Sequence, residues 1–146
     1  KAEELANRFA HVTAVDDLAG AVGQADIVSC ATMSTEPVLH GEWLRPGTHV
    51  DLIGAYRPDM READDAVLAQ GRLFVDSLDT TVGHIGEINI PLEAGTIARD
   101  HLVADYYDLS AFTRQSDDEI TLFKNGGGAP LALMTANHIL ERWRAR

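Results

Sequence analysis

Residues 48–76 read THVDLIGAYRPDMREADDAVLAQGRLFVD, and this stretch decides the predicted fold. Residues 48–55 form an apolar run typical of a strand, and residues 59–70 have a helical pattern that Gly71 can end. Residues 72–76 form a second apolar run. Strands that are buried on both faces of a sheet are apolar throughout, so the stretch predicts two parallel strands joined by a helix.

The same alternation of strand and helix continues on both sides of this unit. The remaining predictions are helices at 1–10, 16–23 and 100–112, strands at 11–15, 25–31 and 119–124, and a final helix that begins near Pro130. Together they predict an α/β fold with a mostly parallel sheet.

The composition limits the classes of function. A chain of 146 residues has the size of one domain. Twelve basic against 23 acidic residues give a net charge of −11, which disfavours nucleic acid and anionic membranes as partners. No apolar run approaches the roughly 20 residues that a membrane-spanning helix needs. We therefore expect neither nucleic acid nor a membrane as a partner.

The cysteine and the histidines give little sign of special chemistry. Cys30 is the only cysteine, so no internal disulfide can form and a reducing compartment such as the cytoplasm is expected. Its place in an apolar run favours a small buried residue over a reactive thiol. His40, His49 and His84 come from separate segments with no neighbouring cysteine, so no metal site is predicted.

Loops that follow the predicted strands are the candidate ligand site. Ligands of open parallel sheets bind outside the carboxyl ends of the strands. Residues 31–34, 53–59 and 124–128 follow three of the predicted strands and carry polar or glycine residues. The alternative is that each glycine only permits a tight turn.

The glycine run 126–128 is the most distinctive of these loops. It leads from a strand into a helix, where backbone N–H groups and the helix dipole favour an anion or a polar ligand group. It is not a phosphate-loop motif, because no Gly-Lys-Ser/Thr follows, and the chain has no Gly-x-Gly-x-x-Gly fingerprint in a strand-to-helix context.

These segments resemble, in order and over almost the whole chain, the ornithine cyclodeaminase/mu-crystallin family. The similarity is carried by residues 25–32, 37–38, 43–49, 54–62, 73–77, 86–91 and 118–124.

The resemblance implies a subunit of two parts. Residues 1–124 correspond to a Rossmann-type NAD(P)-binding domain that is incomplete at its N-terminal side. Residues 125–146 correspond to a C-terminal helix that returns to a substrate and dimerisation domain. We therefore expect the first two strands and the glycine fingerprint to lie outside this chain. A homodimer is expected for the whole protein, and the chain alone is expected to be inactive.

The resemblance also implies roles for individual residues, with NAD or NADP as the cofactor. Thr32 corresponds to a threonine on the cofactor, Asn125 to a position near the nicotinamide, and Gly126 to a substrate contact. The other expected cofactor-binding residues are Ile53, Gly54, Ala55 and Lys124.

Two departures from the family pattern bear on the reaction. Ornithine cyclodeaminases have an acid/base aspartate where this chain has Tyr56, and a lysine where it has Met60. The Arg-Pro-Asp-x-Arg-Glu run at 57–62 instead resembles the ketimine and pyrroline-carboxylate reductases, which implies NAD(P)-dependent reduction of a cyclic imino acid. Tyr56 is then the candidate catalytic residue, or it only lines the pocket. The alternatives are a lyase that converts ornithine into proline and ammonia with bound NAD, and a non-catalytic small-molecule-binding protein.

Overall fold

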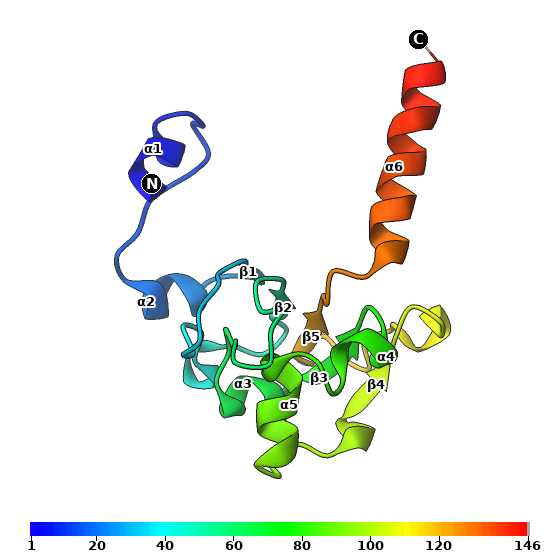
Figure 1. The fold of residues 1–146 in the computed structure, drawn as a ribbon. Coiled ribbons are helices and arrows are strands. Elements are labelled where there is room, and N and C mark those ends of the chain that lie inside the picture. The colour runs from blue at the N-terminus through cyan, green and yellow to red at the C-terminus, as the bar shows by residue number, and fades with distance from the viewer. Residues whose placement is uncertain (146) are drawn as a thin grey trace.

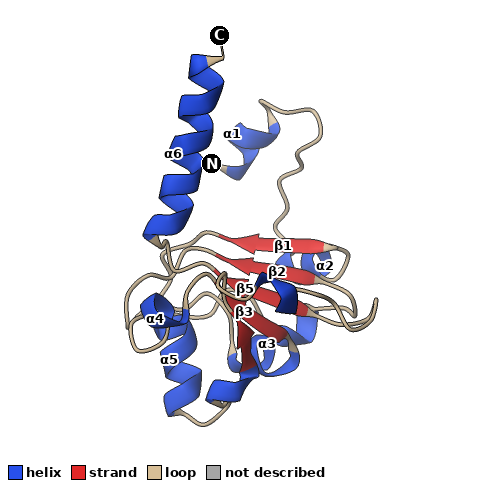
Figure 2. Cartoon of the chain, turned by 90° about the vertical axis from the view of Figure 1, so that its right-hand side faces the viewer, coloured by secondary structure: helices blue, strands red, loops and turns tan. Residues whose placement is uncertain are grey.

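A five-stranded parallel sheet forms the centre of the computed structural model, which describes residues 1–145 (Figures 1 and 2). The strand order is β1-β2-β5-β3-β4, and every neighbouring pair is parallel. The strands are β1 (Ile27–Cys30), β2 (His49–Leu52), β3 (Arg72–Val75), β4 (Leu102–Ala104) and β5 (Thr121–Lys124).

Helices and short 3₁₀ turns connect the strands. The α-helices are α1 (Ala2–Ala6), α2 (Leu18–Val22), α3 (Asp65–Gln70), α4 (Leu78–Thr81), α5 (Gly86–Glu93) and α6 (Ala129–Arg144). The 3₁₀ turns are η1 (Gly41–Trp43), η2 (Arg99–His101) and η3 (Leu109–Ala111).

The main core lies on one face of the sheet. On β2, Val50 and Leu52 are fully buried, whereas His49 and Asp51 on the other face are half-buried. The register places Val50 beside Leu122 of β5. Val67 and Leu68 of α3 and Ile88 of α5 belong to the same buried cluster, so these two helices cover this face.

The structure confirms the predicted α/β class and most of the elements near the centre of the sheet. Strands β1, β2, β3 and β5 each lie within a predicted range. The helix predicted after Asp16 and Asp17 is α2, and Asp17 caps it by accepting a hydrogen bond from the Gly20 amide. The helix predicted near Pro130 is α6.

Three predictions in the N-terminal half need correction. The helix expected at 1–10 ends at Ala6. Residues 11–15 are not a strand, and within residues 1–145 no strand lies beside them to pair with. The helix expected at 59–70 begins only at Asp65, because the amides of Glu62 and Ala63 bond to the Glu87 carboxylate and Asp64 serves as the N-cap.

The helix predicted at 100–112 is wrong. The segment forms η2, strand β4 and η3 instead. Leu102 and Ala104 are buried with Val103 exposed between them, so the side chains alternate as in a strand, and β4 pairs with β3. Three residues are too few for that alternation to stand out in the sequence.

The two flanks of the chain differ from the sheet. Figures 1 and 2 show α6 extending away from the sheet, with the C-terminus at its far end. Neither α1 nor the part of α6 whose burial is described contains a buried residue. Among the described residues, no helix has the length and apolar character needed to cross a membrane.

Candidate functional site

The loops predicted as a ligand site meet at one edge of the sheet. Because all five strands are parallel, their C-terminal ends lie at the same edge, here called the carboxyl edge. It receives the loops after β1, β2, β3 and β5. Short backbone contacts tie these loops together: the Ile53 amide donates to the Cys30 carbonyl at 2.8 Å, and the Asn125 amide donates to the Leu52 carbonyl at 3.0 Å.

Thr32 and Gly54 are brought into direct contact. A side-chain Cβ at Gly54 would lie 1.7 Å from the Thr32 carbonyl oxygen, so only glycine permits this approach of the two loops. The Glu62 carboxylate bridges the same loops: Oε1 accepts from the Thr32 amide at 2.5 Å, and Oε2 accepts from the Gly54 amide at 2.7 Å. The Thr32 residue itself is exposed.

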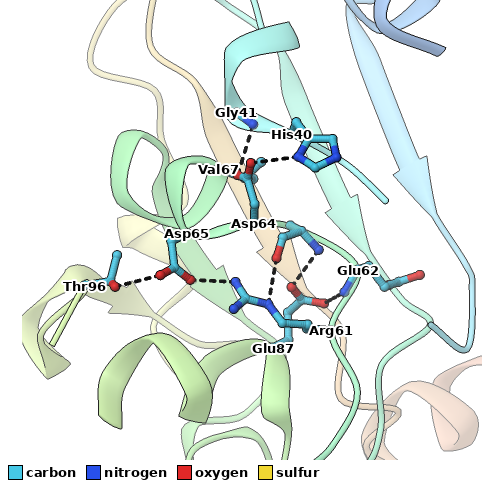
Figure 3. A network of polar contacts seen from close by, with 10 residues as sticks. His40, Gly41, Arg61, Glu62, Asp64, Asp65, Val67, Glu87 and Thr96 are labelled. Atoms are coloured by element: carbon cyan, nitrogen blue, oxygen red, sulfur yellow. Dashed lines mark hydrogen bonds and ion pairs between the residues drawn. The ribbon is translucent and has the colours of Figure 1, made fainter. Parts of the chain in front are cut away.

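A second buried carboxylate supports the first. Glu87, at the start of α5, accepts hydrogen bonds from the Glu62 amide at 2.7 Å and from the Ala63 amide at 3.0 Å (Figure 3). Both glutamates are fully buried. Burial raises the pKa of the Glu87 carboxyl, and the two amide hydrogen bonds and the charge of Lys124 oppose that rise.

The side chain of Lys124 lies inside the molecule. It is fully buried, and its Nζ donates to the carbonyls of Leu52 at 3.1 Å and Asn125 at 2.9 Å. Burial lowers the pKa of this ammonium, whereas the charges of Glu87 and Glu62 act in the opposite direction. In this arrangement Lys124 fixes the ends of β2 and β5 from beneath, rather than offering a charge at the surface.

The glycine run is held by side-chain acceptors. The Gly127 amide donates to Asn125 Oδ1 at 2.8 Å, and the Gly128 amide donates to Asp76 Oδ2 at 3.1 Å. These two N–H groups, expected to be free for an anion, are therefore already partnered. Gly126 is close to β3's loop, because an added Cβ would lie 3.1 Å from Asp76 Oδ1.

The loop after β2, at residues 53–59, has a buried part and an exposed part. Ala55 is fully buried against Met60 and Ile85, so its side chain supports the loop from below. Ile53 and Tyr56 are 42% and 56% exposed. The Tyr56 ring, the candidate catalytic group, therefore stands at the surface of the carboxyl edge.

A mostly apolar hollow lies next to this edge. Beside Asp76, a hollow of about 380 Å³ separates the segment at 106–109 from the first turns of α6. Its lining is mostly apolar: Tyr106, Tyr107, Leu109, Leu131 and Met134 complete it. The sequence did not indicate this hollow, because its walls come from two segments that are distant in the chain.

Reactive and metal-ligating groups contribute little. Burial raises the pKa of the Cys30 thiol to about 11, with the charges of Glu62, Glu87 and Asp51 adding to the effect. The thiol is thus protonated near neutral pH, as the prediction of an unreactive cysteine requires. Within residues 1–145, no three His, Cys, Asp or Glu side chains are arranged to hold a metal ion.

Sequence reasoning missed the carboxylates of Glu62, Asp76 and Glu87. All three are buried and accept hydrogen bonds from backbone amides. For Asp76 and Glu87 the available signal was their context, since Asp76 ends an apolar strand and Glu87 lies between Gly86 and Ile88. A carboxylate in such surroundings needs partners once it is buried.

Comparison with known proteins shows a family to which this chain is similar. The model of the ornithine cyclodeaminase/mu-crystallin family matches residues 1–146. The chain is 60% identical over 133 residues to a Delta(1)-pyrroline-2-carboxylate reductase of Paracoccus denitrificans, covering 89% of this chain and 42% of that protein.

Two solved structures are also similar. One is Thermococcus litoralis Delta(1)-pyrroline-2-carboxylate reductase in complex with NADH and L-proline, with a TM-score of 0.78 and 34% identity over 86% of this chain and 40% of that one. The other is the iminosuccinate reductase of Paracoccus denitrificans in complex with NAD+, with a TM-score of 0.80 and 26% identity over 95% of this chain and 43% of that one.

The chain spans about two fifths of the length of these relatives. The match of the family model nevertheless extends over all 146 residues, and the parallel sheet agrees with the solved structures. The chain belongs to the ornithine cyclodeaminase/mu-crystallin family.

Proposed function

We propose that this chain is part of an NAD(P)-dependent reductase of a cyclic imino acid, of the pyrroline-carboxylate or ketimine type. The observation that carries the proposal is the union of the Thr32 and Gly54 loops at the carboxyl edge, where parallel sheets bind nucleotides. The 60% identity to a pyrroline-carboxylate reductase supports the substrate class. We further propose that residues 1–124 belong to the nucleotide domain and residues 125–146 to the substrate and dimerisation domain.

The residues present fit a dinucleotide. Glu62, Asp76 and Glu87 are buried carboxylates of this edge, and backbone amides donate to each of them, so none of the three is exposed at the surface. Thr32 is exposed and Gly54 is half-buried, so a nucleotide can reach both residues at this edge.

The cofactor, when bound, supplies the hydride. In our assignment Thr32, Ile53, Gly54 and Asn125 hold it, and Gly126 contacts the substrate. Ala55 and Lys124 support the loops from inside.

Tyr56 is suited to assist reduction more than deamination. A tyrosine phenol donates a hydrogen bond but is a poor base. Deamination requires a group that removes and returns protons at the amino-bearing carbon. Reduction of an iminium requires only a donor or water for the final proton.

The decisive assay uses the complete open reading frame that contains these 146 residues. We expect oxidation of NAD(P)H with Delta(1)-pyrroline-2-carboxylate and little ammonia from ornithine with catalytic NAD. Robust release of ammonia and proline from ornithine would instead identify a cyclodeaminase. Ligand binding without turnover would identify a binding protein.

The variant Tyr56→Phe removes the phenolic hydroxyl and keeps the ring. We expect reduction to slow by up to ~10²-fold, the low end for lost acid–base assistance. An unchanged rate would assign Tyr56 to the wall of the pocket.

The assembly and the location are proposed on separate grounds. Helix α6 exposes Leu133, Ile139, Leu140 and Trp143, an apolar surface that fits packing against the other domain in a homodimer. Sedimentation of the complete protein as a monomer at micromolar concentration would contradict this. The lone cysteine fits the cytoplasm, the location we propose.

A further inference from the structure

Five hydrogen bonds to backbone amides or carboxylates from four other segments converge on Glu62. Besides its two carboxylate bonds, its own amide donates to Glu87, and its carbonyl accepts from the amides of Val38 at 2.8 Å and Leu39 at 2.9 Å. Glu62 therefore joins its own segment to the loop after β1, the loop after β2, and the start of α5. Figure 3 shows its amide beside the Glu87 carboxylate.

The two amides that its carboxylate binds belong to different loops. Thr32 follows β1 and Gly54 follows β2, so the Glu62 carboxylate accepts one amide hydrogen bond from each loop. Each carboxylate oxygen binds one loop, so this planar group acts together with the Ile53–Cys30 backbone bond in setting the spacing between them. Gly54 permits that spacing because no side chain intervenes.

The position of the carboxylate is itself fixed from behind. Glu87 holds the Glu62 amide at 2.7 Å, and Lys124 is a fully buried cation whose charge acts on both glutamates. A charged acceptor held in this way binds its two donors more strongly than a neutral one would. The loops are consequently arranged before any ligand arrives.

We propose that Glu62 is a positioning residue that presets the distance between the Thr32 and Gly54 loops for the nucleotide. The proposal rests on the proposed function for the identity of the ligand. It requires no contact between Glu62 and the nucleotide, because the side chain is fully buried. Because the two loops are already ordered, nucleotide binding does not include the free-energy cost of ordering them.

The test is Glu62→Gln in the complete protein. Glutamine keeps the shape but turns an NH₂ group toward one of the two amides, so one loop loses its acceptor. We expect the KM and the dissociation constant of NAD(P)H to rise about tenfold or more, the effect of losing one hydrogen bond to a charged group. We expect kcat at saturating nucleotide and the KM of the imino acid to change by less than about threefold, because bound nucleotide restores the loops.

The matched control is Glu93→Gln, which removes the same charge from an exposed position near the end of α5. It should leave all four constants unchanged. An unchanged nucleotide affinity in a folded Glu62→Gln protein would overturn the proposal. A fall in kcat of about tenfold with no change in the KM of NAD(P)H would also overturn it.

A measurement on the unaltered protein covers the case in which Glu62→Gln does not fold. Without nucleotide, the amides of Thr32 and Gly54 should exchange hydrogen slowly, although Thr32 lies in an exposed loop. Exchange of both at the rate of unprotected amides would overturn the proposal. Nucleotide binding measured by fluorescence separates the two hypotheses: if the protein binds NAD(P)H but reduces no imino acid, the proposed reaction fails while Glu62 is still tested.

Discussion

The body of the sheet, here residues 39–124, differs from the two flanks of the chain in the burial of its side chains. Every described buried residue lies between Leu39 and Lys124, and the described residues on either side of this range are exposed or half-buried. Inside the body, buried charges have partners and apolar side chains pack together. On α6, large apolar side chains lie in the open, with Trp143 at 70% exposure.

The difference shows that the residues of the body bury one another's apolar side chains, whereas the apolar side chains of α6 remain exposed in this chain. A helix of this kind gains most of its stability in proteins from packing of its apolar face. Substitutions in the two regions should therefore differ sharply in effect.

The largest effect is expected for Lys124→Met. Methionine fills similar space but removes the buried ammonium, which leaves the charges of Glu62 and Glu87 without their nearest buried cation. Breaking a buried charge arrangement in this way costs about 3–5 kcal/mol of unfolding free energy. Urea denaturation measures it, with the exposed Lys1→Met as the matched control, and a loss below about 1 kcal/mol would show that the buried charges do not depend on Lys124.

The next comparison uses one substitution in both regions. Leu122→Ala opens a cavity in the centre of the sheet and should cost about 2–5 kcal/mol. Leu133→Ala on α6, where the side chain is 62% exposed, should change the stability of this chain by no more than about 0.5 kcal/mol. Similar losses at both positions, measured by thermal or urea unfolding, would mean that α6 packs on the body in solution.

The smallest expected effect is a dependence on pH. The pKa of Glu87 is raised in the folded chain, so its contribution to stability is fully present below the unfolded pKa of about 4.3 and is lost as the pH rises through the folded pKa. The pKa of Asp65 is lowered by Arg61, so its contribution is present above the unfolded value and is lost as the pH falls.

The unfolding free energies of the wild type, Glu87→Gln and Asp65→Asn should therefore be compared across this range. The stability advantage of the wild type over Glu87→Gln should shrink as the pH rises above 4.5, and its advantage over Asp65→Asn should shrink as the pH falls below 4. If the curves for the wild type and Glu87→Gln run parallel, the Glu87 carboxyl does not contribute to the pH dependence of the unfolding free energy.

Much of the body could be predicted because burial leaves a pattern in the sequence. Apolar runs such as 25–31 and 72–76 indicated strands, and glycines marked the ends of helices and strands. The expected burial on both faces fits β3 but is wrong for β1, whose residues are exposed or half-buried. The failures lie where tertiary contacts decide. Residues 11–15 have strand composition but no strand to pair with, and β4 is too short to be distinguished from a helix.

The candidate site divides in the same way. The loops at 31–34, 53–59 and 124–128 could be located, because parallel strands place their ends together. The carboxylates that hold these loops could not, because a glutamate in a sequence is ordinarily a surface residue. Nothing local distinguishes Glu62 from an exposed acid such as Glu93; the distinction arises only when distant amides converge on it.

Cys30 gives the carboxyl edge a built-in reporter. The thiol ends β1 next to the loop that Glu62 holds, and its pKa of about 11 makes it nearly inert toward alkylating reagents at neutral pH. An opening that admits water to this corner would return the thiol to ordinary reactivity. A change in the labelling rate of this one native atom therefore reports a change in the solvent access of the edge, without any engineered probe.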